Sequence, residues 1–109
     1  MAVLGAAAGG GKSVLQTLSF INSTTWSPAQ DMNAKIYVIG AGGSGGAGTY
    51  VGTGGGAGGC AVTIADLAAS TTYTITIGAP GLPVHFGPSN GNAGGNTTFA
   101  GSGISTLTG

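Results

Sequence analysis

Short segments with a strand-like pattern, separated by turn-forming residues, dominate the hydrophobic pattern of this chain. The segment Lys35–Ile39 is largely apolar, and the segment Thr71–Ile77 alternates with a period of two. In the second segment Tyr73, Ile75 and Ile77 share one face, and three threonines share the other. This alternation is typical of a strand with one buried face. We therefore predict that Tyr73, Ile75 and Ile77 belong to the core.

Four further segments indicate strands, and no segment has the periodicity of a convincing helix. These segments are Ser13–Asn22, Cys60–Asp66, Asn96–Phe99 and Ile104–Leu107. Short strands between Gly- and Pro-rich turns predict an all-β fold, a small antiparallel β-sandwich of the jelly-roll or TNF-like type. We divide the chain into an N-terminal attachment segment with the first strand, residues 1–22, and a glycine-rich β domain, residues 23–109. Residues 1–11, rich in Gly and Ala, are expected to be flexible until they dock.

Two glycine-rich tracts interrupt the strand pattern. Residues 40–59 hold twelve glycines in twenty positions, and residues 78–95 hold six glycines and three prolines. A free glycine tract would be a flexible linker, but both tracts lie between predicted strands and contain almost no serine. The ordered alternative is a set of polyglycine-II-like helices packed side by side, because only glycine lets backbones approach so closely. The sequence leaves flexible loops and packed helices both open.

Two glycine motifs invite a nucleotide-binding interpretation, which the context opposes. Gly40–Gly45 fits G-x-G-x-x-G after an apolar strand, with Asp66 further on, but a Rossmann unit then needs a helix. Each interior glycine costs a helix about 1 kcal/mol, so the following glycines exclude it. Gly9–Ser13 resembles the end of a P-loop, but the required first glycine is Ala6. A nucleotide-binding enzyme is retained only as the disfavoured alternative.

Charge excludes several classes of partner. The formal net charge is zero, and the charged side chains are Lys12, Asp31, Lys35 and Asp66. Two lysines without arginine cannot form the basic surface that nucleic acids or anionic membranes require. No apolar stretch is long enough to insert into a membrane, and no secretory signal is recognisable, so we expect synthesis in a cytoplasm. A neutral, weakly charged chain is prone to associate, which predicts a homo-oligomer or a larger assembly.

Candidate chemistry is sparse. His85 is the single histidine and has no acid or nucleophile nearby in sequence, so no catalytic residue is predicted. Cys60 and His85 do not make a metal-ligand set, and no metal or cofactor is predicted. Cys60 is interpreted as a small buried residue at the start of a strand. The candidate receptor or partner contacts are Tyr50, His85 and Phe86, since aromatics on glycine-rich loops can stack on sugars or insert into a partner. Their alternative role is to fill gaps in the glycine block.

Several motifs occur in an order that resembles the glycine-rich domain of bacteriophage tail-fibre and virion proteins, with similar domains in some receptor kinases. The resemblance covers about residues 20–103 and is carried by Trp26-x-Pro28, Lys35-Ile-Tyr-Val-Ile-Gly-Ala-Gly-Gly-Ser-Gly-Gly, Gly54-Gly-Gly-Ala-Gly-Gly, Thr72-Tyr-Thr-Ile-Thr-Ile-Gly-Ala-Pro-Gly81 and Gly94-Gly-Asn-Thr-Thr-Phe99. It implies an antiparallel sandwich with bundled glycine helices, usually trimeric, at the end of a fibre or on a particle surface. Family members generally continue into another glycine run and closing strands, whereas this sequence ends at Gly109, so we expect either that a neighbouring chain completes the sheet or that the domain is reduced.

The resulting hypothesis is a non-enzymatic virion structural protein, made in the host cytoplasm and anchored to the particle by its N-terminus. Its expected partners are copies of itself in a homotrimer, other virion proteins of the capsid or tail, and a host surface polysaccharide or protein. Capsid decoration or head fibre and tail-fibre tip remain alternatives. A cellular extracellular binding domain is a further alternative, which predicts glycans at Asn22 or Asn96.

Overall fold

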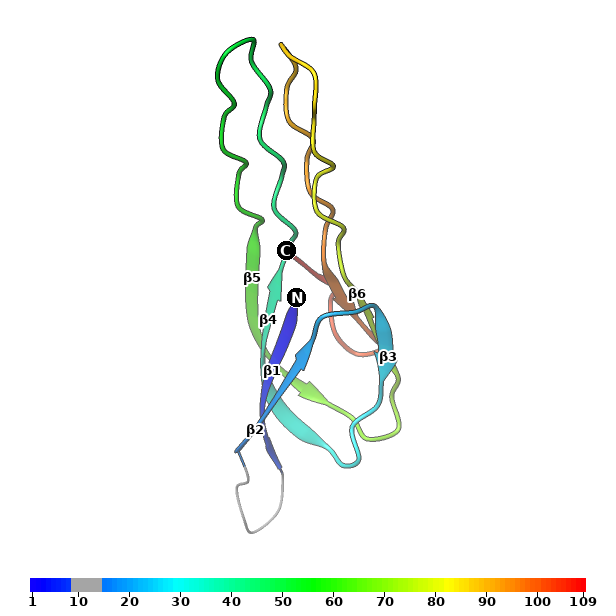
Figure 1. Ribbon diagram of the computed structural model, residues 1–109. Helices are drawn as coiled ribbons and strands as arrows, with labels where there is room; N and C mark the ends of the chain where they lie inside the picture. Colours follow the sequence, from blue (N-terminus) through cyan, green and yellow to red (C-terminus); the bar gives the residue numbers. More distant parts are fainter. Residues whose placement is uncertain (9–14) are drawn as a thin grey trace.

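The computed structural model describes residues 1–8 and 15–109, and this part of the chain forms two four-stranded antiparallel sheets (Figure 1). The strands are β1 (Ala2–Ala8), β2 (Leu15–Phe20), β3 (Thr24–Trp26), β4 (Met32–Ile39), β5 (Cys60–Leu67), β6 (Tyr73–Thr76), β7 (Thr98–Ala100) and β8 (Leu107–Thr108). The first sheet has the order β2-β1-β4-β5 and the second the order β3-β6-β7-β8. No helix occurs among the described residues. The predicted all-β sandwich is therefore confirmed.

The core lies between the two sheets and takes side chains from both. The first sheet contributes the buried residues Ala2, Ala34, Ile36, Val38 and Leu67, and the second sheet contributes Tyr73, Ile75 and Phe99. In β6, Tyr73 and Ile75 are buried while the threonines are exposed, and Ile77 just beyond the strand is half-buried. The predicted faces of this strand are thus confirmed, because a period of two allows only one face to meet the other sheet.

Three aromatic rings pack against one another at one side of the sandwich. The rings of Tyr73 and Phe99 are stacked with their centroids 5.4 Å apart, and Trp26 lies 6.2 Å from Tyr73. The Tyr73 hydroxyl accepts a hydrogen bond of 3.0 Å from the Ala68 N–H, so its polar end is satisfied. Gly101 passes over the same ring, where an added Cβ would collide with it. These contacts join β3, β6 and β7 to the turn after β5.

Two expectations about the first sheet are wrong. Residues 2–8 form β1, which pairs with both β2 and β4, instead of a flexible arm. Their Gly- and Ala-rich pattern carries no amphipathic signal, but backbone pairing between two strands needs none. Residues 9–11, and with them the P-loop-like Gly9–Ser13, lie outside the described residues. Cys60 does begin a strand, but it is exposed because it points to the outer face of β5. A separate attachment role for residues 1–22 stays a prediction.

The glycine tracts extend from the sandwich as four runs that lie side by side, which we call the glycine shaft (Figure 1). The first run comprises residues 40–48, the second 51–59, the third 78–86 and the fourth 87–96. The molecule is accordingly elongated, with extents of 63 × 21 × 19 Å. The C-terminal Gly109 lies at the foot of the shaft, where its N–H and carbonyl both bond to Thr97.

Backbone hydrogen bonds with a period of three hold the glycine shaft together. The first run lies between the others. Its N–H groups that donate to any one neighbouring run are three residues apart. Donors to the second run are Gly40 and Gly43, and donors to the fourth run are Ala41, Ser44 and Ala47. The third run donates from Gly81 to the Gly42 carbonyl at 2.9 Å. Three residues per turn without internal bonds is the geometry of a polyproline-II helix, so these runs are packed helices.

Glycine is required where the backbones meet. A Cβ added at Gly55 or Gly58 would collide with the carbonyl oxygen of Gly43 or Gly40 in the first run. These positions are three apart, so they form the inward face of the second run. Around Gly54 and Gly56, by contrast, an added Cβ would meet nothing within 4 Å. The second run therefore packs through one face and leaves its other faces free.

Candidate functional site at the distal tip

Two turns meet at the end of the glycine shaft that lies away from the sandwich (Figure 1). One joins the first and second runs at residues 49–50, and the other joins the third and fourth runs at residues 86–88. Ala47 and Ser89 link the turns through a pair of backbone hydrogen bonds of 2.9 and 2.8 Å. Gly87 comes so close to Gly48 that an added Cβ would lie 2.7 Å from its carbonyl oxygen. The packed runs thus hold both turns in fixed proximity.

Of the predicted contact residues, Tyr50 and Phe86 belong to these turns, and His85 directly precedes the second turn. Tyr50 is 95% exposed and Phe86 is 85% exposed, and His85 is also exposed. Val51, which the sequence analysis did not single out, is 75% exposed beside Tyr50. The alternative that these rings fill gaps inside the glycine block is wrong for Tyr50 and Phe86, because filled gaps would bury them.

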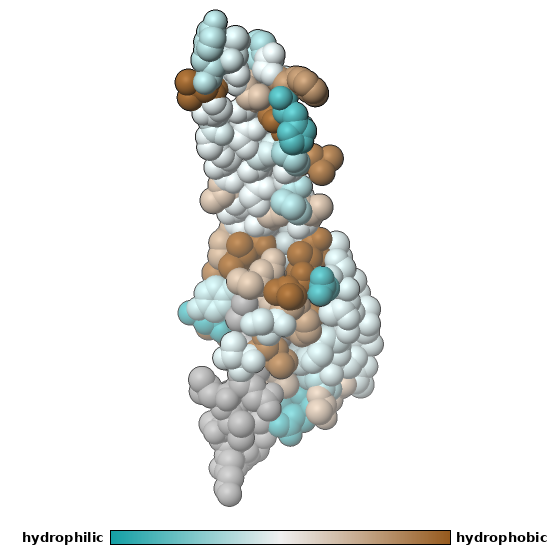
Figure 2. Space-filling view, viewed as in Figure 1, coloured by the Kyte–Doolittle hydropathy of each residue, from teal (hydrophilic) through white to brown (hydrophobic). Residues whose placement is uncertain are grey.

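We call the surface formed by Tyr50, Val51, His85 and Phe86 the tip. Figure 2 shows that the shaft below is nearly neutral in hydropathy, with coloured side chains projecting near its end. The Ser89 hydroxyl donates a hydrogen bond of 2.7 Å to the Phe86 carbonyl and so fixes the second turn. Removing a large exposed apolar side chain from water is favourable, so several of them on neighbouring turns indicate a contact surface.

A depression of about 380 Å³ lies in the shaft just below the tip. Its lining includes Val51, Thr53, Ser89 and Asn90 together with glycine backbone. The Thr53 hydroxyl accepts a hydrogen bond of 2.9 Å from the Gly46 N–H, which turns this side chain toward the first run. The depression therefore offers hydroxyl, amide and backbone groups next to the turns that carry Tyr50 and Phe86, a combination suited to a polar, uncharged ligand.

The charged side chains that the structure describes lie in the sandwich, away from the tip. Asp31 accepts a hydrogen bond of 2.8 Å from the Ala69 N–H, and Asp66 accepts one of 2.8 Å from the Asn33 amide. The Lys35 Nζ lies 5.3 Å from the centre of the Tyr37 ring, on the outer face of β4. Both aspartates thus have structural partners.

The remaining motifs do not form a chemical site in this structure. Gly40–Gly45 leads into the extended first run, so the helix of a dinucleotide-binding turn is absent there, as predicted. The described residues include no group of three or more His, Cys, Asp or Glu side chains that could hold a metal ion. Within the same residues, no helix has the length and apolar character to span a bilayer.

Comparison with known proteins bears on the family. No match was found among curated proteins or solved structures. A family described as a glycine-rich domain matches residues 16–109, which include β3 to β8, all of β2 except its first residue and the whole glycine shaft. The chain belongs to this glycine-rich domain family.

Proposed function

We propose that the chain is a non-enzymatic structural protein of a bacteriophage particle that binds the host surface through its tip. The observation that carries this proposal is the exposure of Tyr50 and Phe86 at the end of a rigid shaft. Binding residues are commonly placed on loops that a rigid framework positions. Exposed aromatics on such loops supply large contact areas, and they lose little conformational entropy when they bind.

The tip favours a neutral ligand. The charged side chains that the structure describes are all in the sandwich, so Coulomb attraction contributes little to recognition at the tip. Aromatic faces beside hydroxyl and amide groups suit the apolar faces and hydroxyls of sugars. We infer that the ligand is an uncharged host surface polysaccharide, with an uncharged patch of a surface protein as the second choice.

The sandwich is the end that faces the particle in this proposal. Val62 and Ile64 are 50% and 65% exposed on the outer face of β5, and such apolar residues support a contact with capsid or tail proteins. Attachment through the N-terminal segment and assembly into a homotrimer are part of the proposal. A trimer with its tips aligned gains avidity for a repeating polysaccharide, because later binding events become intramolecular.

Binding is tested with the purified full chain on an array of bacterial surface polysaccharides. The same protein is also used as a competitor of adsorption by the phage that carries it. We expect retention of an uncharged polysaccharide and inhibition of adsorption. The double variant Tyr50→Ala/Phe86→Ala should bind more than about tenfold less well, since aromatic hot spots contribute about 2 kcal/mol or more. Thr74→Ala, on the exposed face of β6, is the control and should bind normally.

Location on the particle separates the fibre-tip role from a capsid decoration or head fibre. Cryo-electron microscopy of the particle should show density for this chain at the tail extremity if it is a receptor-binding tip. Regular density over the shell, together with adsorption unaffected by the added protein, would favour the decoration role and contradict the proposed binding role of the tip.

A further inference from the structure

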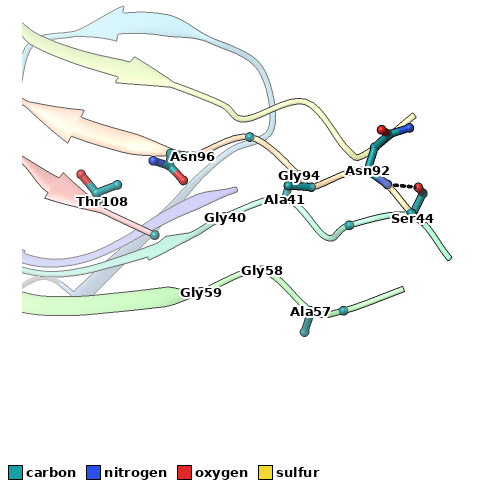
Figure 3. A pocket seen from close by; sticks show the side chains of 16 residues that line it. Gly40, Ala41, Ser44, Ala57, Gly58, Gly59, Asn92, Gly94, Asn96 and Thr108 are labelled. Atoms are coloured by element: carbon teal, nitrogen blue, oxygen red, sulfur yellow. Dashed lines mark hydrogen bonds between the residues drawn. The ribbon is translucent and has the colours of Figure 1, made fainter. Parts of the chain in front are cut away.

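A groove of about 670 Å³ runs along the glycine shaft near its foot. Its floor is the first run at residues 40–44, and its walls are the second run at residues 56–59 and the fourth run at residues 91–96 (Figure 3). Thr108 and Gly109 line its sandwich end. The Asn92 N–H donates a hydrogen bond of 2.8 Å to the Ser44 hydroxyl, which ties one wall to the floor. Three extended backbones thus enclose an open channel parallel to the shaft.

The form of this groove matches one more helix of the kind that builds the shaft. The first run already packs against three neighbours through backbone hydrogen bonds, and the groove lies between two of them. The groove lining contains no charged side chain, so a charged occupant would gain no partner there. An uncharged glycine-rich run in the same conformation would continue the existing packing, with close backbone contacts of the kind that hold the other runs.

Two glycines of the second run have no explanation within the chain itself. At Gly54 and Gly56 an added Cβ would meet nothing within 4 Å, and neither residue has a positive φ. Glycine loses more conformational entropy on folding than any other residue, so it is unfavourable where nothing requires it. Close approach of a backbone from another molecule would require glycine at both positions. Gly56 also lines the groove.

We propose that the groove binds the second run, residues 54–59, of another copy of this chain. That run is uncharged, rich in glycine and exposed on two faces, so it has the chemistry that the groove accepts. The contact joins a run to a groove, so it is heterologous and can close into a ring. In a ring of three, the second runs meet on the axis, and each lies in the groove of its neighbour. This interface rests on the homotrimer part of the proposed function, and it aligns the three tips.

The interface is tested by the mass of the full chain in solution, measured by light scattering and sedimentation velocity. We expect a trimer for the wild type and at least about tenfold weaker association for Gly56→Val. Because nothing in its own chain lies near that Cβ, the variant should keep the wild-type far-ultraviolet circular dichroism. Ile64→Thr, on the exposed outer face of β5, is the control for association through an apolar sheet face and should remain a trimer.

Three outcomes would overturn the interface, and they have different consequences. If Gly56→Val, folded, associates as strongly as the wild type, the groove is not the contact, while the homotrimer stands. If the wild type is monomeric at the highest concentration that stays in solution, both the interface and the homotrimer are wrong. Loss of the trimer in Ile64→Thr but not in Gly56→Val would move the contact to β5. Binding of the tip to polysaccharide is measured separately; a monomer would lose the avidity of the trimer but keep the contacts of a single tip.

Discussion

At the residue scale, the glycines of the second run differ in what they do although they are identical in sequence. Gly55 and Gly58 face carbonyl oxygens of the first run, whereas Gly54 faces open space. The difference follows from the three-residue turn of the helix, which points every third residue at the same neighbour. A glycine-rich segment therefore contains both positions that require glycine for folding and positions that do not.

The first prediction uses this difference. Gly55→Val and Gly58→Val should each destabilise the fold by about 1–3 kcal/mol, because the added side chain overpacks the shaft against a backbone that cannot yield. Gly54→Val should unfold at the wild-type temperature. Thermal unfolding is followed by circular dichroism, at a dilution at which the chains are monomeric. Equal unfolding temperatures for all three variants would show that the runs are not packed.

At the element scale, β6 gives the sandwich its clearest inward face. Ile75 is 1% exposed between β3 and β7, whereas Thr74 beside it points to solvent. Ile75→Asp should prevent folding, because burial of an unpaired carboxylate costs more than about 4 kcal/mol. Thr74→Asp should fold. Solubility, circular dichroism and proteolysis of the two variants give the comparison, and a stable Ile75→Asp protein would mean that the faces of β6 are reversed.

A second prediction at this scale concerns the joint between β6, β7 and the glycine shaft. Thr97 is fully buried, and its hydroxyl accepts a hydrogen bond of 3.1 Å from the Gly78 N–H, where the third run begins. Thr97→Val keeps the shape of the side chain but leaves the Gly78 N–H without an acceptor. This change should lower the free energy of unfolding by about 1–3 kcal/mol. Denaturant unfolding should show this loss, while Thr98→Val serves as the control. A loss of the same size in both variants would contradict the role of the Thr97 hydroxyl.

At the scale of the whole molecule, the shaft transmits the rigidity of the sandwich to the tip only if its runs are ordered. Amide hydrogen exchange tests this directly. The N–H groups of Gly43 and Ser44, which donate to neighbouring runs, should exchange more than about a hundredfold more slowly than that of Tyr50 at the tip. Uniformly fast exchange across residues 40–59 would instead show that this tract is a flexible linker. The shaft would then not hold the tip in a fixed position.

The sequence by itself determined the features that depend on local periodicity. A period of two placed Tyr73 and Ile75 in the core, and the glycines after Gly40 excluded a helix, because both effects act between near neighbours along the chain. The aromatic candidates at the tip were found for a similar reason, since large side chains stand out in a tract of small ones.

Only the tertiary structure decided the features that depend on pairing between distant segments. β1 is apolar without alternation, so its sequence does not mark it as a strand, and it is defined by its pairing with β2 and β4. Cys60 is exposed because the register of β5 with β4 turns it outward. Tyr50 and Phe86, far apart in sequence, share one tip because the first and fourth runs bond to each other. The roles of the individual glycines also depend on the tertiary structure. Some contact a neighbouring backbone and others face a groove, although the residues themselves are identical.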